Sequence, residues 1–200
     1  MSEQVTQTAF NNVLAQAQNA IKRRGVAPVE KWNPDYCGEM DMRIASDGTW
    51  FHEGSPIGRK PLVRLFSTVL RKDEDGKHYL VTPVEKIGIT VDDAPFLAVE
   101  ASYEGAGESQ TISFRTNVED VVTLDADHPL RLEIDPQSGE PGPYILVRGR
   151  LEAKISRAIF YDLVERAVDV ERDGKTLFGI WSAGQFFPFG ERDALFAGAE

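Results

Sequence analysis

The sequence predicts an α+β protein made of two similar antiparallel, half-barrel-like sheets, each with a packed helix, preceded by an N-terminal helix. Three observations predict it. Apolar and polar residues alternate in several stretches, as in half-buried strands. Other stretches repeat apolar residues every three or four positions, as in amphipathic helices. One segment recurs 98 residues further along the chain. We expect an N-terminal helix and lead-in over 1–27, a first half over 28–95 and a second half over 96–200.

Composition and charge narrow the class of protein. The chain has 200 residues and a net charge of −10, which disfavours a nucleic-acid partner because such partners require a basic surface. Its one cysteine, Cys37, allows no internal disulfide and fits a reducing compartment. The sequence contains no apolar run of about 20 residues that would cross a bilayer, and Met1–Gln4 does not open a secretory signal. We therefore expect a cytoplasmic protein with no membrane partner.

The first half is predicted to follow a helix over 8–24, which Gly25 ends. After an irregular stretch over 26–39, alternation over 40–44, a turn at 46–48 and a return over 49–53 indicate a hairpin. Pro61 then falls in the first turn of a helix. The apolar face of that helix consists of Leu62, Leu65, Phe66, Val69 and Leu70. Further strands are expected over 78–82 and 85–91, and, beyond the boundary at residue 95, over 96–103 and 110–115.

The second half is predicted to contain a strand over 130–134 and one long strand over 144–155, where the alternation is clearest. Ser156 caps a helix that is expected to run to about Val170, and a last strand covers 176–182. Near the end, Phe186, Phe187 and Phe189 follow no period. We expect these three rings to fold back onto the core rather than to face a partner.

The 98-residue repeat suggests an internal duplication. It aligns Arg59 with Arg157 and the turn Asp75-Gly76-Lys77 with the turn at 173–175. Two similar halves form a cleft between them, and ligand sites favour such interfaces. Both arginines fall at the entry to a predicted helix, where free N–H groups attract anions. The alternative is that each arginine pairs with one of the 32 acidic residues of the chain.

Motifs for catalysis or cofactor binding are absent from the sequence. It has no phosphate-binding loop, dinucleotide fingerprint, nucleophile elbow or C-x-x-C pair, so we expect no cofactor. Cys37 is interpreted as a small buried hydrophobe rather than a nucleophile. Asp125, Asp127 and His128 have ligand types that suit a divalent ion, but their pattern before a strand favours a solvated turn. We expect no metal.

The chain resembles an uncharacterised bacterial family, domain of unknown function 1285, over about residues 28–189. In the first half the motifs that carry the resemblance are Trp32-Asn33-Pro34, Cys37-Gly38, Asp41-Met42-Arg43-Ile44, Asp47-Gly48-Thr49-Trp50, Gly54-Ser55-Pro56-Ile57 and Val81-Thr82-Pro83-Val84-Glu85-Lys86. In the second they are Phe114-Arg115-Thr116-Asn117, His128-Pro129-Leu130, Pro143-Tyr144 and Arg148. The resemblance implies a duplicated fold whose C-terminal half is similar to pleckstrin-homology domains, a ligand site between the halves for a nucleotide-like molecule, and a role in signalling. It implies no catalytic residues.

The leading functional prediction is therefore a binding module for a small anionic, nucleotide-like ligand in the cleft between the halves. Its expected ligand-binding residues are Arg43, Trp50, Arg59, Arg115, Tyr144, Arg148, Arg150 and Arg157. Arginines on the polar faces of strands would hold the anion, and Trp50 and Tyr144 would stack on a planar ring. The alternative is a protein-interaction adaptor that uses the pleckstrin-like face without a small ligand. An enzyme centred on Cys37 or on the cluster at 125–128 is the least favoured alternative.

Overall fold

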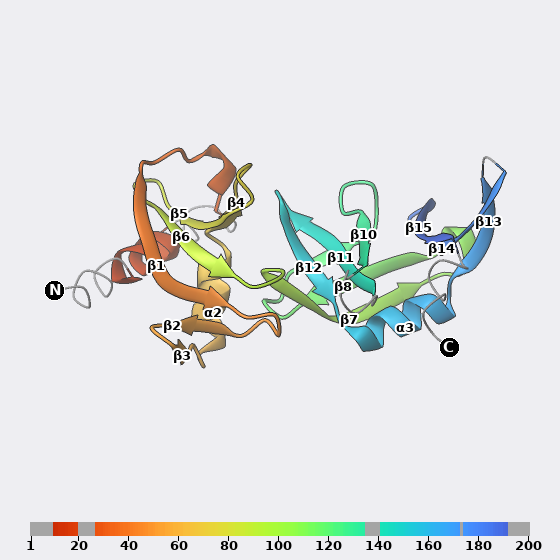
Figure 1. The fold of residues 1–200 in the computed structure, drawn as a ribbon, viewed down its shortest axis with the longest axis horizontal. Coiled ribbons are helices and arrows are strands. Elements are labelled where there is room, and N and C mark those ends of the chain that lie inside the picture. Colours follow the sequence, from red (N-terminus) through yellow and green to blue (C-terminus); the bar gives the residue numbers. More distant parts are fainter. Residues whose placement is uncertain (1–9, 20–26, 135–140, 173, 192–200) are drawn as a thin grey trace. The chain divides into compact units, whose positions relative to one another are not determined.

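The computed structural model describes residues 10–19, 27–134, 141–172 and 174–191 (Figure 1). The chain forms two units, described separately below. The first consists of Met1–Pro95 with Gly149–Leu151, and the second of Phe96–Arg148 with Glu152–Glu200. Among the described residues, no helix is long and apolar enough to cross a membrane.

The first unit is a six-stranded sheet with strand order β3-β2-β1-β6-β5-β4. Residues 10–19 are helical and precede it. The elements that follow are η1 (Val29–Lys31), β1 (Tyr36–Ile44), β2 (Trp50–His52), β3 (Ser55–Pro56), α2 (Lys60–Ser67), β4 (Leu70–Lys72), β5 (His78–Val81) and β6 (Lys86–Val91). Neighbouring strands are antiparallel except β1 and β6, which are parallel. The pairing of β1 with β6 thus joins two meanders, β1–β3 and β4–β6.

The core of the first unit follows the predicted alternation. Met40, Met42 and Ile44 on β1 are buried, as expected. Trp50 stacks at 6.5 Å on Phe66 of α2, so the helix packs on this face of the sheet. Strand β1 begins at Tyr36 rather than at Met40, because its first residues pair with β6 while few of them are buried. The alternation that marks a half-buried strand is therefore missing there.

The second unit contains a six-stranded sheet of order β10-β11-β12-β7-β8-β9 and a three-stranded sheet of order β13-β14-β15. Its strands are β7 (Phe96–Glu104), β8 (Thr111–Thr116), β9 (Val121–Thr123), β10 (Leu130–Ile134), β11 (Pro141–Arg148), β12 (Leu151–Ile155), β13 (Val168–Arg172), β14 (Lys175–Ser182) and β15 (Gln185–Glu191). Its helices are η2 (Gly107–Ser109) and α3 (Arg157–Glu165).

The long strand predicted over 144–155 is two strands, β11 and β12, separated by a turn at Gly149 and Arg150. The prediction was wrong because odd-numbered residues are buried on both sides of this turn, as at Val147 and Leu151. The apolar alternation therefore continues across it. Gly149, with φ of +54°, was the local signal for the turn.

The end of the chain also differs from expectation in part. Helix α3 begins directly after Ser156 as predicted, but it ends at Glu165. Residues 168–172 form β13 instead, because they pair with β14. The three C-terminal phenylalanines lie on β15 with 3–5% of their surface exposed. The prediction that they fold back onto the core is confirmed.

The two halves are duplicated, but the equivalent segments differ from those aligned by the 98-residue shift. That shift places α2, β4, β5 and β6 on α3, β13, β14 and β15. The first set completes a six-stranded sheet, whereas β13–β15 form a sheet of their own. Both helices lead into an antiparallel meander, but the meanders belong to sheets of different strand order, so Arg59 and Arg157 do not occupy equivalent places relative to the two six-stranded sheets.

The shared strand order identifies the true equivalence. When the six strands of each sheet are numbered in chain order, both sheets have the strand order 3-2-1-6-5-4. In both sheets the first and sixth strands are parallel, β1 with β6 and β7 with β12. Strands β1–β6 therefore correspond to β7–β12. The helix α2 falls between the third and fourth strands of the first half, whereas α3 follows the sixth strand of the second.

Candidate functional site

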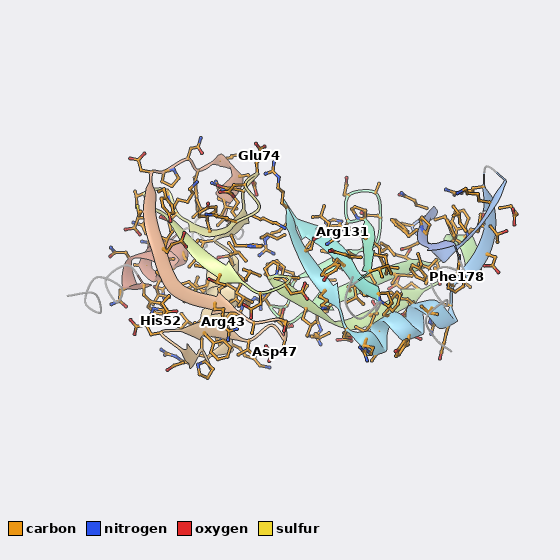
Figure 2. All side chains as sticks on the ribbon, in the orientation of Figure 1. Arg43, Asp47, His52, Glu74, Arg131 and Phe178 are labelled. Carbon is orange, nitrogen blue, oxygen red and sulfur yellow. The ribbon has the colours of Figure 1, made fainter. Side chains whose placement is uncertain are left out.

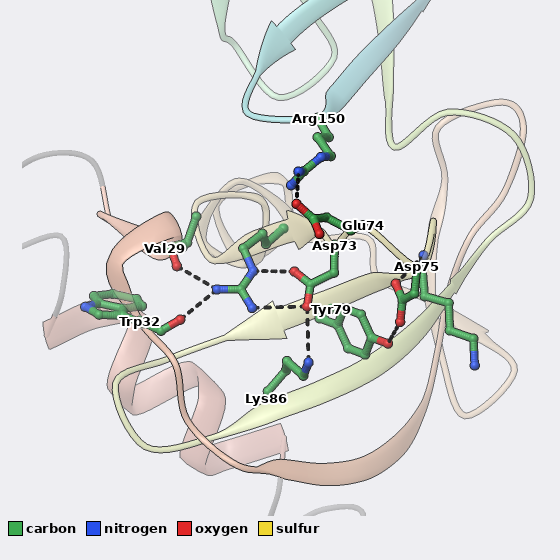
Figure 3. A network of polar contacts seen from close by, with 10 residues as sticks. Val29, Trp32, Asp73, Glu74, Asp75, Tyr79, Lys86 and Arg150 are labelled. Atoms are coloured by element: carbon green, nitrogen blue, oxygen red, sulfur yellow. Dashed lines mark hydrogen bonds and ion pairs between the residues drawn. The ribbon is translucent and has the colours of Figure 1, made fainter.

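The equivalence of the two sheets places an arginine, a tyrosine and a lysine on the same three strands in each half. In the first half, Arg71 on β4 lies directly opposite Tyr79 on β5. Lys86 on β6 places its ammonium 4.5 Å from the centre of the Tyr79 ring. We call these three residues the first cluster (Figure 3).

Arg71 is the centre of the first cluster. Its Nε donates to Asp73 Oδ1 at 2.6 Å and its Nη2 to Asp73 Oδ2 at 3.2 Å. Its Nη1 donates to the carbonyl oxygens of Val29 at 2.9 Å and Trp32 at 2.7 Å. These carbonyls belong to η1 and the residue after it. The guanidinium therefore binds the segment 29–32 to the sheet. Only 8% of the Arg71 side chain is exposed.

The other two side chains of the first cluster, Lys86 and Tyr79, also have partners within the protein. Lys86 Nζ lies 3.1 Å from Asp73 Oδ2. Burial raises the pKa of Asp73, but hydrogen bonds from Arg71 and Lys86 outweigh it and leave that pKa below its ordinary value. The Tyr79 hydroxyl donates to Asp75 Oδ2 at 2.6 Å, and this bond, with burial, raises the pKa of Tyr79 to about 12. The first cluster therefore has a structural role, because its contacts hold segments of the first half together.

In the second half, Arg131 on β10 lies directly opposite Tyr144 on β11 (Arg131 is labelled in Figure 2). The Arg131 guanidinium stacks 4.5 Å from the centre of the Tyr144 ring, and Lys154 Nζ on β12 lies 5.9 Å from that centre. We call these three residues the second cluster. Lys154 pairs with Leu97 on β7 as Lys86 pairs with Tyr36 on β1, so the correspondence includes the first strand of each sheet.

The arginine of the second cluster is more exposed than the arginine of the first. Arg131 donates from Nε and Nη2 to the two carboxylate oxygens of Glu152, each at 3.0 Å, and from Nη1 to Glu133 at 2.6 Å. The hydrogen bonds from Arg131 to Glu152, and then to Glu133, raise the pKa of Arg131 above its ordinary value. The Arg131 side chain is 46% exposed. No backbone carbonyl of the described residues accepts a hydrogen bond from it.

The ligand residues expected in the first half lie on different faces. Trp50 is 1% exposed, so a ligand ring could not stack on it without opening the core. Arg43 is 45% exposed, forms an ion pair with Asp92 at 2.5 Å and lies over the Phe51 ring. Arg59 is exposed at the N-cap of α2. These three side chains form no common site.

In the second half, two expected residues form ion pairs with the same turn. Arg115 pairs with Glu119 at 3.3 Å, and Arg148 pairs with the next residue, Asp120. Arg115 also pairs with Glu100 at 2.6 Å. Two arginines from β8 and β11 therefore converge on one acidic turn, in which Glu119 has φ of +70°.

The remaining expected residues make other contacts or are exposed. Tyr144 is in the second cluster and is covered by Arg131. Arg157 is the exposed first residue of α3. Arg150, in the turn between β11 and β12, donates from Nη2 to Glu74 Oε1 at 2.8 Å.

Cys37 is exposed, so its interpretation as a small buried hydrophobe was wrong. It lies near the start of β1, in the part of the strand that is largely unburied. Its thiol donates to the carbonyl oxygen of Asp35 at 3.4 Å. The sequence pattern did not show that Cys37 is exposed on a strand, because it placed the start of that strand at residue 40.

The cluster at 125–128 forms a turn held by Asp125. Its Oδ1 accepts hydrogen bonds from the backbone nitrogens of Asp127 at 3.0 Å and His128 at 2.9 Å, and lies 3.1 Å from His128 Nδ1. Burial raises the pKa of Asp125, but the bonds from His128 and the backbone lower it on balance. Within the described ranges, no group of three His, Cys, Asp or Glu side chains is arranged to hold a metal ion.

Sequence reasoning missed the two clusters. Arg71 and Arg131 are each followed two residues later by an acid to which they bind, Asp73 and Glu133. This Arg-x-acid spacing at a strand was the available signal. Such a short pattern cannot identify a site by itself, because it does not show which residue lies opposite the arginine on the neighbouring strand.

Comparisons with known proteins agree on one family. A family model described as Domain of unknown function (DUF1285), N-terminal domain, matches residues 27–94, and one described as Protein of unknown function (DUF1285), C-terminal domain, matches residues 95–189. A search of curated proteins finds no match.

Two crystal structures of DUF1285 family proteins are similar to this chain. One, from Silicibacter pomeroyi DSS-3, is 49% identical, covers 92% of this chain and 97% of its own, and gives a TM-score of 0.80. The other, from Shewanella baltica OS155, is 25% identical, covers 62% of this chain and 91% of its own, and gives a TM-score of 0.50.

Proposed function

Because this chain belongs to the DUF1285 family, whose description states no function, we propose from its geometry that it is a binding module for a small anionic ligand with a role in signalling. The ligand is held in the second half by Arg115 and Arg148. Nucleotides are the first anions to test, because a phosphate group accepts paired hydrogen bonds from guanidinium forks.

The observation that supports the proposal is the convergence of Arg115 and Arg148 on the turn of Glu119 and Asp120. A bound anion would accept hydrogen bonds from the guanidinium groups that now pair with these carboxylates. The exposed fractions of the Glu119 and Asp120 side chains are 49% and 36%. Exposed ion pairs contribute about 0–1 kcal/mol, so a ligand that binds both arginines can displace these carboxylates into water at little cost.

A thermal-shift titration of the full chain tests the proposal, with inorganic phosphate, nucleoside mono- and triphosphates, and chloride at matched ionic strength. A ligand at 100 times its Kd adds about 2.7 kcal/mol to the free energy of unfolding. The best anion should bind Arg115→Gln and Arg148→Gln about tenfold or more weakly, since each loses a charge-assisted hydrogen bond. Arg43→Gln is the control, because Arg43 has one exposed ion pair and lies in the first half. Equal affinity for all variants, or no stabilisation by any anion, contradicts the proposal.

Protein interaction is the second candidate function, as an adaptor that needs no small ligand. It is favoured by β10, an edge strand of its sheet that carries the 46%-exposed Arg131 side chain and the 49%-exposed Ile134. Edge strands and exposed apolar side chains are sites at which other chains dock.

A further inference from the structure

We infer that the second cluster, Arg131 with Tyr144 and Lys154, is a docking site for a short segment of a partner protein, bound through its backbone carbonyl oxygens. The inference rests on the second candidate function and gives it a surface and a kind of partner. It is independent of the anion site at Arg115 and Arg148.

The first half supplies the precedent, because there the equivalent cluster already holds a chain segment. Arg71 Nη1 donates to the carbonyls of Val29 and Trp32, three residues apart around the 3-10 turn η1. The segment that supplies these carbonyls reduces the exposed fraction of the Arg71 side chain to 8%. The first cluster therefore shows how an arginine at this strand position recognises a single turn of peptide.

Arg131 has the same position, but no segment of the described residues binds it through backbone carbonyls. A guanidinium carries five N–H donors. Arg71 uses four of them within the described residues, two for Asp73 and two for the carbonyls. Arg131 uses three, all for carboxylates, so two N–H groups of a half-exposed arginine have no protein acceptor among the described residues. One of these donors is on Nη1 and the other on Nη2, and their number equals that of the carbonyls that Arg71 binds from Nη1.

The local charge favours a neutral acceptor over an anion. Arg131 and Lys154 contribute two positive charges, and Glu133 and Glu152 contribute two negative charges, so the surface is neutral overall. Arg131 is already held by a bidentate pair with Glu152. The carboxylates of Glu133 and Glu152 beside Arg131 repel a phosphate, whereas a neutral peptide carbonyl can accept from the remaining N–H groups without this cost. The occupant is therefore a one-turn peptide whose carbonyls three residues apart point the same way.

The chain itself provides the probe. A peptide of residues 27–36 with blocked ends, the segment that Arg71 binds, is titrated into the isotope-labelled full chain and followed by NMR. We expect chemical-shift changes on β10, β11 and β12. We expect Arg131→Gln to weaken binding about tenfold or more, because charge-assisted hydrogen bonds are lost. Arg131→Lys should not restore binding, because an ammonium cannot reproduce the fork.

Arg43→Gln is the matched control, since Arg43 also stacks on a ring and forms an exposed ion pair. Thermal unfolding of each variant establishes that it is folded. Shifts confined to other strands, or binding unchanged in Arg131→Gln, would overturn the docking site while leaving an interaction role in place. No shift anywhere at millimolar peptide overturns both. If inorganic phosphate shifts the same resonances and competes with the peptide, the site is an anion site and the peptide proposal fails.

Discussion

Arg71 and Arg131 occupy the same position in two sheets of the same strand order, yet one is closed over by a chain segment and the other is half exposed. Each lies opposite a tyrosine, and each binds an acid two residues further on. Their surroundings, rather than their residue types, determine what each contributes to the protein.

Loss of the arginine should therefore have very different effects on stability in the two halves. Arg71→Gln leaves the carbonyls of Val29 and Trp32 without their donor in a buried place and leaves Asp73 with Lys86 alone, so we expect the free energy of unfolding to fall by about 3 kcal/mol. Arg131→Gln removes exposed pairs and should cost less than about 1 kcal/mol. Urea unfolding of both variants measures the difference. Equal losses would mean that the two clusters are equally closed.

His78 should make the stability of the protein depend on pH. Its side chain is 8% exposed, and its Nε2 has no hydrogen-bond partner among the described residues. Burial, and then Lys72, lower the pKa of His78 from 6.5 to about 4. Above pH 6.5 the imidazole is neutral in both states, and its full contribution to stability is present. Between pH 6.5 and 4 the unfolded chain takes up a proton that the folded chain does not, so stability falls as pH falls.

The size of that loss approaches about 3 kcal/mol at pH 4. His78→Gln stays neutral at every pH, so the difference in unfolding free energy between parent and variant should change by this amount from pH 7 to pH 4. Urea unfolding at pH 7, 5.5 and 4 measures it. A constant difference across these values would show that His78 is protonated in the fold as readily as in water.

Gly179 should tolerate no side chain. A Cβ there would clash with the carbonyl oxygen of Phe187 and lie 2.8 Å from the Phe186 ring, inside the pairing of β14 and β15. We expect Gly179→Ala to lower the free energy of unfolding by about 1–3 kcal/mol, because the strands must separate. Gly58→Ala meets no atom within 4 Å and is the control. Thermal unfolding compares the two, and similar melting temperatures would contradict the prediction.

Cys37 should react in the folded protein. Its thiol is exposed, so a disulfide reagent such as DTNB should label it without unfolding. Cys37→Ser should change the free energy of unfolding by less than about 0.5 kcal/mol. Labelling that occurs only in denaturant would restore the buried interpretation.

The alternating segments were predictable because one face of each strand is buried. The pattern at Met40, Met42 and Ile44 gave both the strand and its inward face correctly. It failed where burial has no period, as at Tyr36, and where a turn preserves the period, as at Gly149.

The site was less predictable because it depends on strand pairing. The 98-residue shift compared segments along the chain and therefore selected Arg59 and Arg157. The positions of Arg71 and Arg131 become equivalent only when the strand order is known. Likewise, no local pattern could show that Trp50 lies in the core or that Arg115 and Arg148 meet at one turn.

The parallel pairing of the first and last strand in each sheet has a consequence for synthesis on the ribosome. Strand β1 emerges long before β6, and β7 long before β12, so each opening strand waits with one unpaired edge while the rest of its half is translated. Such non-local pairing slows folding and exposes the nascent chain to wrong partners. The first half can close once Val91 has left the exit tunnel. The protein therefore passes this vulnerable stage twice, one half at a time.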